Sequence, residues 1–203
     1  MDARRHEEHA VPAKIVTVLR SGGEYRAEHV ERLRQQAETH APDAEFICLR
    51  DDGVGGWPLQ HDWPGWWAKL CLFSLPGPVL YMDLDTSIVG DLTPLLRMAA
   101  KHDFIALRDF YRPQNMGSGL MAWRGDMRHV LTAFQADAEN VMRTHNRPEK
   151  WGDQGFIEPL TADVREHWQD LLPGAAVSWK VHCRNGGIPA SARVVCFHGR
   201  PRP

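Results

Sequence analysis

The chain has 203 residues, of which 43% are hydrophobic, and this is enough to bury a substantial core within one ordinary domain. Its 24 basic and 26 acidic side chains are mixed along the sequence and give a formal charge of -2, which argues against nucleic-acid binding. The sequence holds no run of about 18 apolar residues, so we expect no transmembrane segment, while peripheral contact with a membrane stays open.

The ends of the chain and its cysteines bear on domain organisation and compartment. Residues 1–13 are polar and rich in histidine, and we expect them to form a flexible leader to a single domain over residues 14–203. Four cysteines are scattered without paired spacing: Cys48, Cys71, Cys183 and Cys196. This pattern indicates neither a disulfide framework nor a structural zinc site, and it favours the reducing cytoplasm.

The hydrophobic pattern predicts alternating strands and helices, which is typical of an α/β fold with a mostly parallel central sheet. The predicted strands cover residues 14–19, 45–49, 79–82, 104–107 and 119–123. The predicted helices cover residues 24–40, 66–73, 94–100 and 127–143. Two late apolar runs cover residues 175–181 and 192–197. In folds of this class, ligands bind beyond the carboxyl ends of the strands.

Two aspartates, Asp83 and Asp85, follow directly after the apolar run 79–82. If the chain turns there, both carboxylates can reach one hard divalent cation, which would offset their repulsion and bind phosphate oxygens in its remaining positions. The spacing alone is weak evidence, because a solvated turn can have the same sequence. The preceding buried strand is stronger evidence, since it directs the pair toward the ligand side of the sheet.

Five short blocks occur in a fixed order along the chain: WAKLCLF (67–73), VLYMDLDT (79–86), SGLM (118–121), WGDQGF (151–156) and VCFHGRPRP (195–203). Together they resemble the lysine helix, metal motif, Asn-Ser-Gly strand, Asp-Gln block and closing segment of family 8 glycosyltransferases, the relatives of glycogenin and of bacterial galactosyltransferases. The resemblance implies a GT-A fold, which is a Rossmann-like fold of transferases that use nucleotide-diphospho-sugars.

The same resemblance implies a metal-dependent hexosyltransferase. Asp83 and Asp85 would hold Mn²⁺ or Mg²⁺ on the diphosphate of a nucleotide-sugar, commonly a UDP-sugar, and Lys69 and Arg202 would neutralise phosphate charge. The sugar would pass to an unknown acceptor with retention of configuration. The alternative for Lys69 is an exposed helix lysine with its stem over Trp66.

Asp153 and Gln154 would lie near the transferred sugar, where Asp153 would contact hydroxyls or, in an inverting enzyme, deprotonate the acceptor. The alternative for Asp153 is a helix N-cap. Ser118 belongs to the segment that resembles the sugar-contacting strand. The family usually has asparagine directly before Ser-Gly, whereas this chain has Gly117, so Asn115 would have to replace that contact.

The third metal ligand also departs from the family pattern, because Cys196 stands where the family has histidine. A thiolate is a poor ligand for Mn²⁺ or Mg²⁺, so we assign the third position to His198, two residues further along the same strand face. The alternative is a histidine at a strand end with no metal. By analogy, further donor contacts are expected from Val18, Leu19, Arg20, Leu84 and Gly199.

Two other functions remain open. The run 79–85 also resembles the nucleophile motif of haloacid dehalogenase-type phosphatases, in which Asp83 would attack phosphorus and Asp85 would act as the acid. That motif normally ends the first strand of its domain, whereas about 80 residues precede it here, and Ser87 stands at its usual threonine position. A non-catalytic protein that binds a nucleotide-sugar is the other alternative.

Overall fold

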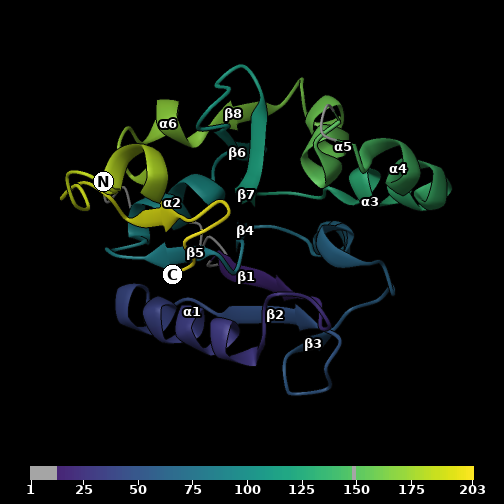
Figure 1. The fold of residues 1–203 in the computed structure, drawn as a ribbon, viewed down its shortest axis with the longest axis horizontal. Helices are drawn as coiled ribbons and strands as arrows, with labels where there is room; N and C mark the ends of the chain where they lie inside the picture. Colours follow the sequence, from purple (N-terminus) through teal and green to yellow (C-terminus); the bar gives the residue numbers. More distant parts are fainter. Residues whose placement is uncertain (1–12, 148–149) are drawn as a thin grey trace, which may run out of the picture.

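The computed structural model describes residues 13–147 and 150–203, in which two β-sheets are surrounded by helices (Figure 1). The strands are β1 (Lys14–Leu19), β2 (Phe46–Arg50), β3 (Trp57–Pro58), β4 (Val79–Met82), β5 (Thr86–Ile88), β6 (Phe104–Arg108), β7 (Met116–Trp123), β8 (Arg165–His167), β9 (Ala176–Ser178) and β10 (Val194–Cys196). The helices are α1 (Ala27–His40), 3-10 helix η1 (Gly65–Ser74), α2 (Thr93–Ala99), α3 (Arg128–Ala136), α4 (Ala138–His145), α5 (Gly152–Leu160), α6 (Trp168–Leu171) and π-helix η2 (Trp179–Cys183). The predicted leader, apart from Ala13, lies outside the described residues.

The larger sheet has seven strands in the order β3-β2-β1-β4-β7-β6-β8. β1 pairs in parallel with β2 and with β4, whereas β7 runs antiparallel to both of its neighbours, β4 and β6. The predicted α/β fold with a mostly parallel sheet is confirmed. A smaller sheet, β5-β10-β9, brings the C-terminal part of the chain beside the segment that follows β4 (Figure 1).

The larger sheet separates two hydrophobic cores. Leu80 and Met82 of β4 pack into a core with α1 and α2, while Val79 and Tyr81 pack into a core with η1 and α3. All four side chains of this strand are buried, because helices cover both faces of the sheet. The fully apolar run 79–82 is therefore a central strand, as the sequence predicts, and the polar residues after it lie at the sheet edge where ligands bind.

The predicted helix over residues 66–73 forms as the 3-10 helix η1, and this changes which side chains share a face. Residues three apart eclipse in a 3-10 helix, so Leu70 and Phe73 point the same way and are fully buried. Trp66 points elsewhere and is 52% exposed. As an α-helix, residues 66–73 would be expected to place Trp66, Leu70 and Phe73 on one face, and this expectation is wrong.

Other elements differ from the sequence prediction at their ends. The helix expected over residues 127–143 is two helices, α3 and α4, because the chain breaks at Asp137, whose side chain accepts a hydrogen bond from Asn140 (2.8 Å). The strand expected from Gly119 begins earlier, at Met116. The run 175–181 forms only β9 before the chain enters η2. Among the described residues, none of the helices has the length and apolar character needed to cross a bilayer.

Candidate functional site

The Asp83-Leu84-Asp85 segment forms a tight turn between β4 and β5. The Asp83 backbone amide donates to the carbonyl of Gly119 on β7 (2.9 Å), which extends the β4-β7 pairing by one residue. The Asp83 carbonyl accepts from both the amide (3.0 Å) and the side-chain hydroxyl (2.7 Å) of Thr86. The turn is therefore fixed at both ends, and it presents the two carboxylates beyond the carboxyl end of β4, as predicted.

The Asp83 carboxylate is surrounded by donors. Lys69 approaches both of its oxygens, at 3.1 and 3.3 Å, and the buried Tyr81 hydroxyl donates to Oδ1. A Cβ built on Gly119 would lie 3.2 Å from Asp83 Oδ2, so glycine at that position leaves the carboxylate room. Burial, followed by the charge of Asp83, raises the pKa of Tyr81 well above its usual value, so this hydroxyl stays protonated and donates.

Lys69 is the centre of a buried polar cluster. Its ammonium lies 2.9 Å from Asp153 Oδ2 and 3.1 Å from the Ser118 hydroxyl, which itself donates to Asp153 (2.8 Å). Burial alone would lower the pKa of Lys69, but the carboxylates of Asp153 and Asp83 outweigh it and raise this pKa. Lys69 is thus a buried cation, and the alternative of an exposed lysine is excluded.

Asp153 is the second residue of α5, after Gly152, and its side chain points at Lys69 and Ser118. The N-cap position is held by Trp151, so Asp153 is not a helix cap. One cluster therefore joins Lys69 of η1, Ser118 of β7 and Asp153 of α5. These residues belong to three separate sequence blocks. They meet because β7 lies beside β4 and because both η1 and α5 pack on the same face of the sheet.

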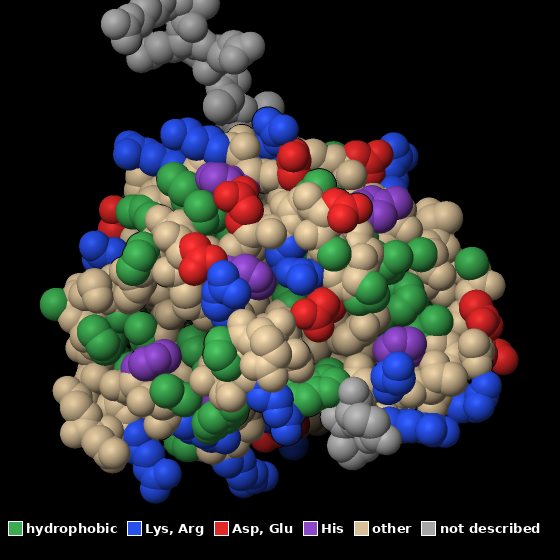
Figure 2. All heavy atoms as spheres, turned by 90° about the horizontal axis from the view of Figure 1, so that it is seen from above, with side chains coloured by type: hydrophobic (Ala, Val, Ile, Leu, Met, Phe, Trp, Pro, Cys, Tyr) green, Lys and Arg blue, Asp and Glu red, His purple; other side chains and the backbone are tan. Residues whose placement is uncertain are grey.

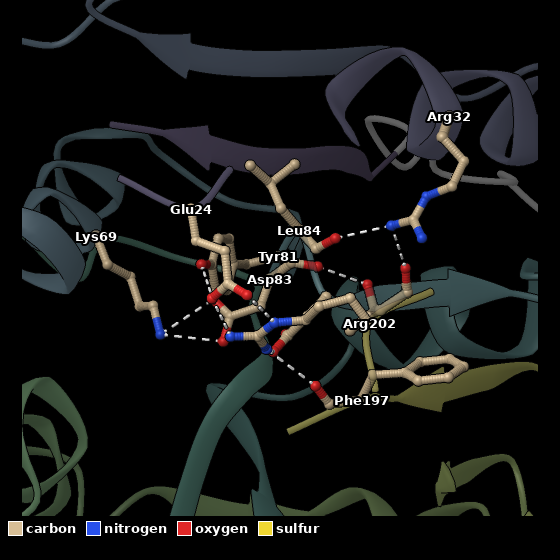
Figure 3. Close-up of polar contacts among 10 residues, drawn as sticks. Glu24, Arg32, Lys69, Tyr81, Asp83, Leu84, Phe197 and Arg202 are labelled. Atoms are coloured by element: carbon tan, nitrogen blue, oxygen red, sulfur yellow. Dashed lines mark hydrogen bonds and ion pairs between the residues drawn. The ribbon is translucent and has the colours of Figure 1, made fainter. Parts of the chain in front are cut away.

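The second carboxylate of the turn, Asp85, faces the C-terminal tail. Its side chain pairs with Arg202, and its backbone carbonyl accepts from the Phe197 amide (2.8 Å). Arg202 also pairs with Glu24 (2.6 Å) and donates to the Phe197 carbonyl (3.2 Å) (Figure 3). Burial, followed by the charge of Asp83, raises the pKa of Asp85 to about 6 even though Arg202 opposes the shift.

Behind the turn, Arg32 of α1 binds the backbone. One of its guanidinium nitrogens donates to the carbonyls of Leu84 (2.7 Å) and Thr86 (3.0 Å) (Figure 3). Two further nitrogens of this side chain are buried and find no partner among the described residues. Arg32 therefore serves the carbonyls of the turn, even though part of its own hydrogen-bonding capacity is unused.

The predicted third ligand, His198, lies on the wall of the same cavity as both aspartates. Its Nε2 hydrogen-bonds the Ser178 hydroxyl, and its ring stacks on Phe110 (centroids 5.6 Å apart). Burial and then the charge of Lys180 lower the pKa of His198, so the imidazole is neutral, as a metal ligand must be. Within residues 13–147 and 150–203, however, no three His, Cys, Asp or Glu side chains converge to hold a metal ion.

Cys196 is a less suitable ligand than His198. Its thiol is buried, and this burial, together with the charges of Asp85 and Asp83, raises its pKa well above the usual value. A protonated thiol does not bind a hard cation. The two carboxylates, in contrast, fit a divalent cation by charge and by oxygen chemistry, because their mutual repulsion is what such an ion would relieve.

Two cavities meet at this turn. The larger one, of about 590 Å³, lies on the side of β6, β7 and α5, and the smaller one, of about 420 Å³, lies on the side of β1 and the C-terminal tail. Both are lined by the same four residues: Trp66, Lys69, Asp83 and Asp85. These four residues are called the shared wall below. In the view of Figure 2, acidic, basic and histidine side chains are interspersed over the face of the molecule.

The predicted site residues divide between these cavities. The larger cavity is lined by Ser118, Asp153, Gln154 and His198, and the smaller one by Val18, Arg20, Leu84 and Arg202. Arg20 is already paired with Asp51 and Asp62. Three predicted donor contacts line neither cavity: Leu19, Asn115 and Gly199. Asn115 lies in the turn before β7, where its backbone bonds Asp109 and Arg112.

Sequence reasoning missed several lining residues. Glu24 and Tyr25 line the smaller cavity, and Asp109 and Tyr111 line the larger one. The rule that ligands bind beyond the carboxyl ends of strands could have identified Asp109 and Tyr111, because they follow β6 directly. No local signal marks Glu24, whose role depends on Arg202 from the opposite end of the chain.

Comparison with known proteins finds no matching family model and no significant match among curated proteins. Solved structures do match. The glycosyltransferase GlyE of Streptococcus pneumoniae TIGR4 has a TM-score of 0.65 at 12% identity, over 95% of this chain and 56% of that one. The galactosyltransferase LgtC, in complex with donor and acceptor sugar analogs, has a TM-score of 0.61 at 14% identity, over 93% of this chain and 88% of that one. The bifunctional glycosyltransferase WbbM has a TM-score of 0.62 at 11% identity, over 94% of this chain and 46% of that one.

These likenesses establish that the chain has the GT-A fold of glycosyltransferases, as the sequence blocks predict. The chain spans about half the length of the GlyE and WbbM structures. The phosphatase alternative loses support, because Asp83 follows β4 rather than the first strand of the domain.

Proposed function

We propose that this chain transfers a sugar from a nucleotide-sugar, with UDP as the expected nucleotide, to an acceptor, and that the transfer depends on Mn²⁺ or Mg²⁺ held by Asp83 and Asp85. The observation that supports this most is the shared wall, because one pair of carboxylates faces two cavities in a fold that glycosyltransferases share. One cavity would take the nucleotide diphosphate, and the other would take the transferred sugar and the acceptor.

The charges around the turn support a bound cation. Asp83, Asp85 and Asp153 are accompanied by Lys69 and Arg202, and Arg202 is shared with Glu24. Negative charge is therefore in excess. Burial is the largest cause of the raised pKa of Asp85, and the charge of Asp83 raises it further. When bound, a divalent cation would supply positive charge to the departing diphosphate. His198, which lines the same cavity, would have to move toward the two carboxylates to complete the ligands.

The remaining residues have separate tasks in this proposal. Arg202, which lines the smaller cavity, would leave Asp85 and neutralise diphosphate charge. Lys69 holds Asp83 and Asp153 in place. Because Asp153 is already engaged by Lys69 and by the Ser118 hydroxyl, the proposal gives it contact with sugar hydroxyls in a retaining reaction rather than deprotonation of the acceptor. Gln154, whose amide has no partner among the described residues, would contact the same sugar.

The test is thermal unfolding with UDP, GDP and ADP, each with and without Mn²⁺. A nucleotide at about 100 times its dissociation constant should stabilise the protein by about 2.7 kcal/mol. We expect a metal-dependent shift with one nucleotide, lost in Asp83→Asn and Asp85→Asn but kept in Asp163→Asn, a change at an exposed aspartate remote from both cavities. Absence of any shift in the wild type would contradict the proposal. The nucleotide-sugar of the nucleotide that gives the shift is then incubated with the protein. Slow hydrolysis indicates an enzyme, and its absence indicates a protein that only binds the nucleotide-sugar.

A further inference from the structure

The larger cavity gathers exposed aromatic side chains. Among the described residues, three aromatic side chains are largely exposed: Trp57 (45%), Trp66 (52%) and Tyr111 (63%). Two of them, Trp66 and Tyr111, line the larger cavity, and Trp151 and Phe110 line it as well. Large apolar surfaces that are left in contact with water and grouped around one cavity indicate a ligand that covers them.

These aromatic rings are held in position by the surrounding structure. A Cβ built on Gly152 would lie 2.7 Å from Trp66 Nε1, so the indole rests against a backbone position that only glycine can occupy. Trp151 has a φ of 63°, in the left-handed region that residues with side chains rarely adopt, and its ring lies against the Arg112 guanidinium (4.0 Å to the centroid). Backbone strain of this kind is concentrated at ligand sites.

Tyr111 follows β6, and its ring and backbone contact other residues at this cavity. Its ring meets His198 edge to face, with centroids 5.1 Å apart, and its backbone amide donates to Asp109 Oδ1 (2.8 Å). The same oxygen also accepts from the Arg112 amide (2.8 Å), while Oδ2 of Asp109 has no hydrogen bond within the described parts of the chain. The loop after β6 therefore presents a fixed aromatic ring beside an available carboxylate oxygen.

The aromatic, amide and carboxylate side chains that line the larger cavity suit a sugar. A pyranose ring has a face of C–H groups, which packs on an aromatic ring, and a rim of hydroxyls, which needs hydrogen-bonding partners such as Asp109 and Gln154. A long-chain alcohol would leave these polar groups without partners, at a cost for each one. A flexible polypeptide would need to become ordered within the cavity.

We propose that the outer part of the larger cavity binds the acceptor as a sugar ring packed on Trp66 and Tyr111, so that the acceptor is a glycoside or glycan. This inference rests on the proposed sugar transfer. Trp66 belongs to the shared wall, whereas Tyr111 and Asp109 line only the larger cavity. An acceptor placed between Tyr111 and Trp66 would therefore approach a donor at the Asp83-Leu84-Asp85 turn from the side opposite the nucleotide.

The test measures two things on the full chain. The first is binding of methyl glycosides and disaccharides, by saturation-transfer NMR without any donor. The second is release of the nucleotide from a nucleotide-sugar, chosen for the nucleotide that shifts the unfolding temperature. Three classes of acceptor are added: those glycosides, a long-chain alcohol, and serine- or tyrosine-containing peptides. We expect a glycoside to bind and to accelerate release. Its KM should rise about tenfold in Tyr111→Ala and in Trp66→Ala.

Matched variants separate stacking from general damage. Tyr111→Phe keeps the ring and should keep the wild-type KM for the acceptor, while Trp57→Ala removes an equally exposed indole that lines neither cavity and should change nothing. The inference is overturned if no glycoside binds or accelerates release, if only the alcohol or a peptide does, or if Trp57→Ala has the same effect as Trp66→Ala. If no nucleotide shifts the unfolding temperature, the proposed function is contradicted instead. The NMR experiment contains no donor, so it still shows whether a glycoside binds.

Discussion

The two carboxylates of the Asp83-Leu84-Asp85 turn are two residues apart in sequence, yet their surroundings differ. Asp83 faces a closed cluster in which the side chains of Lys69 and Asp153 are 8% and 10% exposed. Asp85 faces a tail in which the Arg202 and Glu24 side chains are 24% and 44% exposed. The site thus has two halves. The half around Asp83 is fixed before any ligand binds, whereas the half around Asp85 is movable, because it is held by ion pairs that a ligand can replace.

In the proposed transferase, this difference would separate two tasks of the donor site. A rigid cluster keeps the geometry of the reacting centre, since its charges cannot rearrange without leaving a carboxylate buried and unpaired. The ion pair between Arg202 and Glu24 costs little to open, because water solvates both partners, whereas Asp85 on the other side of Arg202 is only 16% exposed. Substitutions on the Lys69 side should therefore affect folding, and substitutions on the Arg202 side should affect ligand binding.

The largest effect is expected for Lys69→Met. Methionine has a similar length but no charge, so the buried Asp153 and the partly exposed Asp83 would lose their cation, at a cost of about 3–5 kcal/mol in the free energy of unfolding. Urea unfolding measures the loss. Lys101→Met, at an exposed lysine, is the control and should change stability little. A loss below about 1 kcal/mol for Lys69→Met would mean that the cluster is not the rigid half of the site.

Arg32→Met should have the next largest effect, because it removes the donor to the Leu84 and Thr86 carbonyls. We expect a loss of about 1–2 kcal/mol in stability, moderated because two of the nitrogens removed are buried and unpartnered. The metal-dependent nucleotide shift should also decrease, since the turn would loosen. Arg97→Met, at an exposed arginine of α2, provides the comparison. Equal behaviour of the two variants would assign no role to Arg32 in holding the turn.

The pH dependence of stability tests the Asp85 half directly. The pKa of Asp85 is about 6 in the folded protein and 3.8 ordinarily. Between these values the folded state binds a proton that the unfolded state does not, so stability rises as pH falls. From about pH 7 to about pH 5 we expect a gain of about 1 kcal/mol, measured with a chelator present as the difference between the wild type and Asp85→Asn. A difference that does not change with pH, or that changes in the opposite direction, would show that Asp85 is not destabilised by its surroundings.

The smallest effect on stability is expected for Arg202→Ala, at a cost of about 1 kcal/mol. The Glu24 partner is 44% exposed, and Asp85, although only 16% exposed, can take up a proton because its pKa is about 6. Donor binding should weaken more than folding, because Arg202 lines the smaller cavity. Nucleotide titration by calorimetry, together with unfolding, measures both quantities. Arg200→Ala changes an exposed arginine in the same tail and should leave both nearly unchanged. If Arg202→Ala destabilised the protein as strongly as Lys69→Met, the ion pairs of Arg202 would be as important for folding as the buried cluster around Lys69.

Much of the fixed half could be predicted from the sequence. The apolar run 79–82 defines a buried strand, and the rule for ligand position in α/β folds then places Asp83 at the site. The burial of Lys69 could not be predicted, because a 3-10 helix and an α-helix of the same sequence place its side chain differently. Its partners, Ser118 and Asp153, also come from distant segments that only the packed sheet brings together.

The movable half was less predictable for a similar reason. The pairing of β10 with β5 brings the C-terminal tail to Asp85, and Arg202 then reaches Glu24 across 178 residues of sequence. Short-range periodicity contains no information about such contacts. Asn115, which the family resemblance offers as a replacement for the asparagine before Ser-Gly, lies outside both cavities, in the turn before β7 begins at Met116.

The position of Trp66 in the shared wall has a consequence for the order of events in turnover. Its indole borders both cavities and rests against Gly152, so ligands on either side contact the same ring. A molecule bound on one side therefore changes the surface available to the other, and the two substrates are coupled through one side chain. If the two cavities take the donor and the acceptor as we propose, this arrangement would favour a ternary complex in which both substrates are present together before either product leaves.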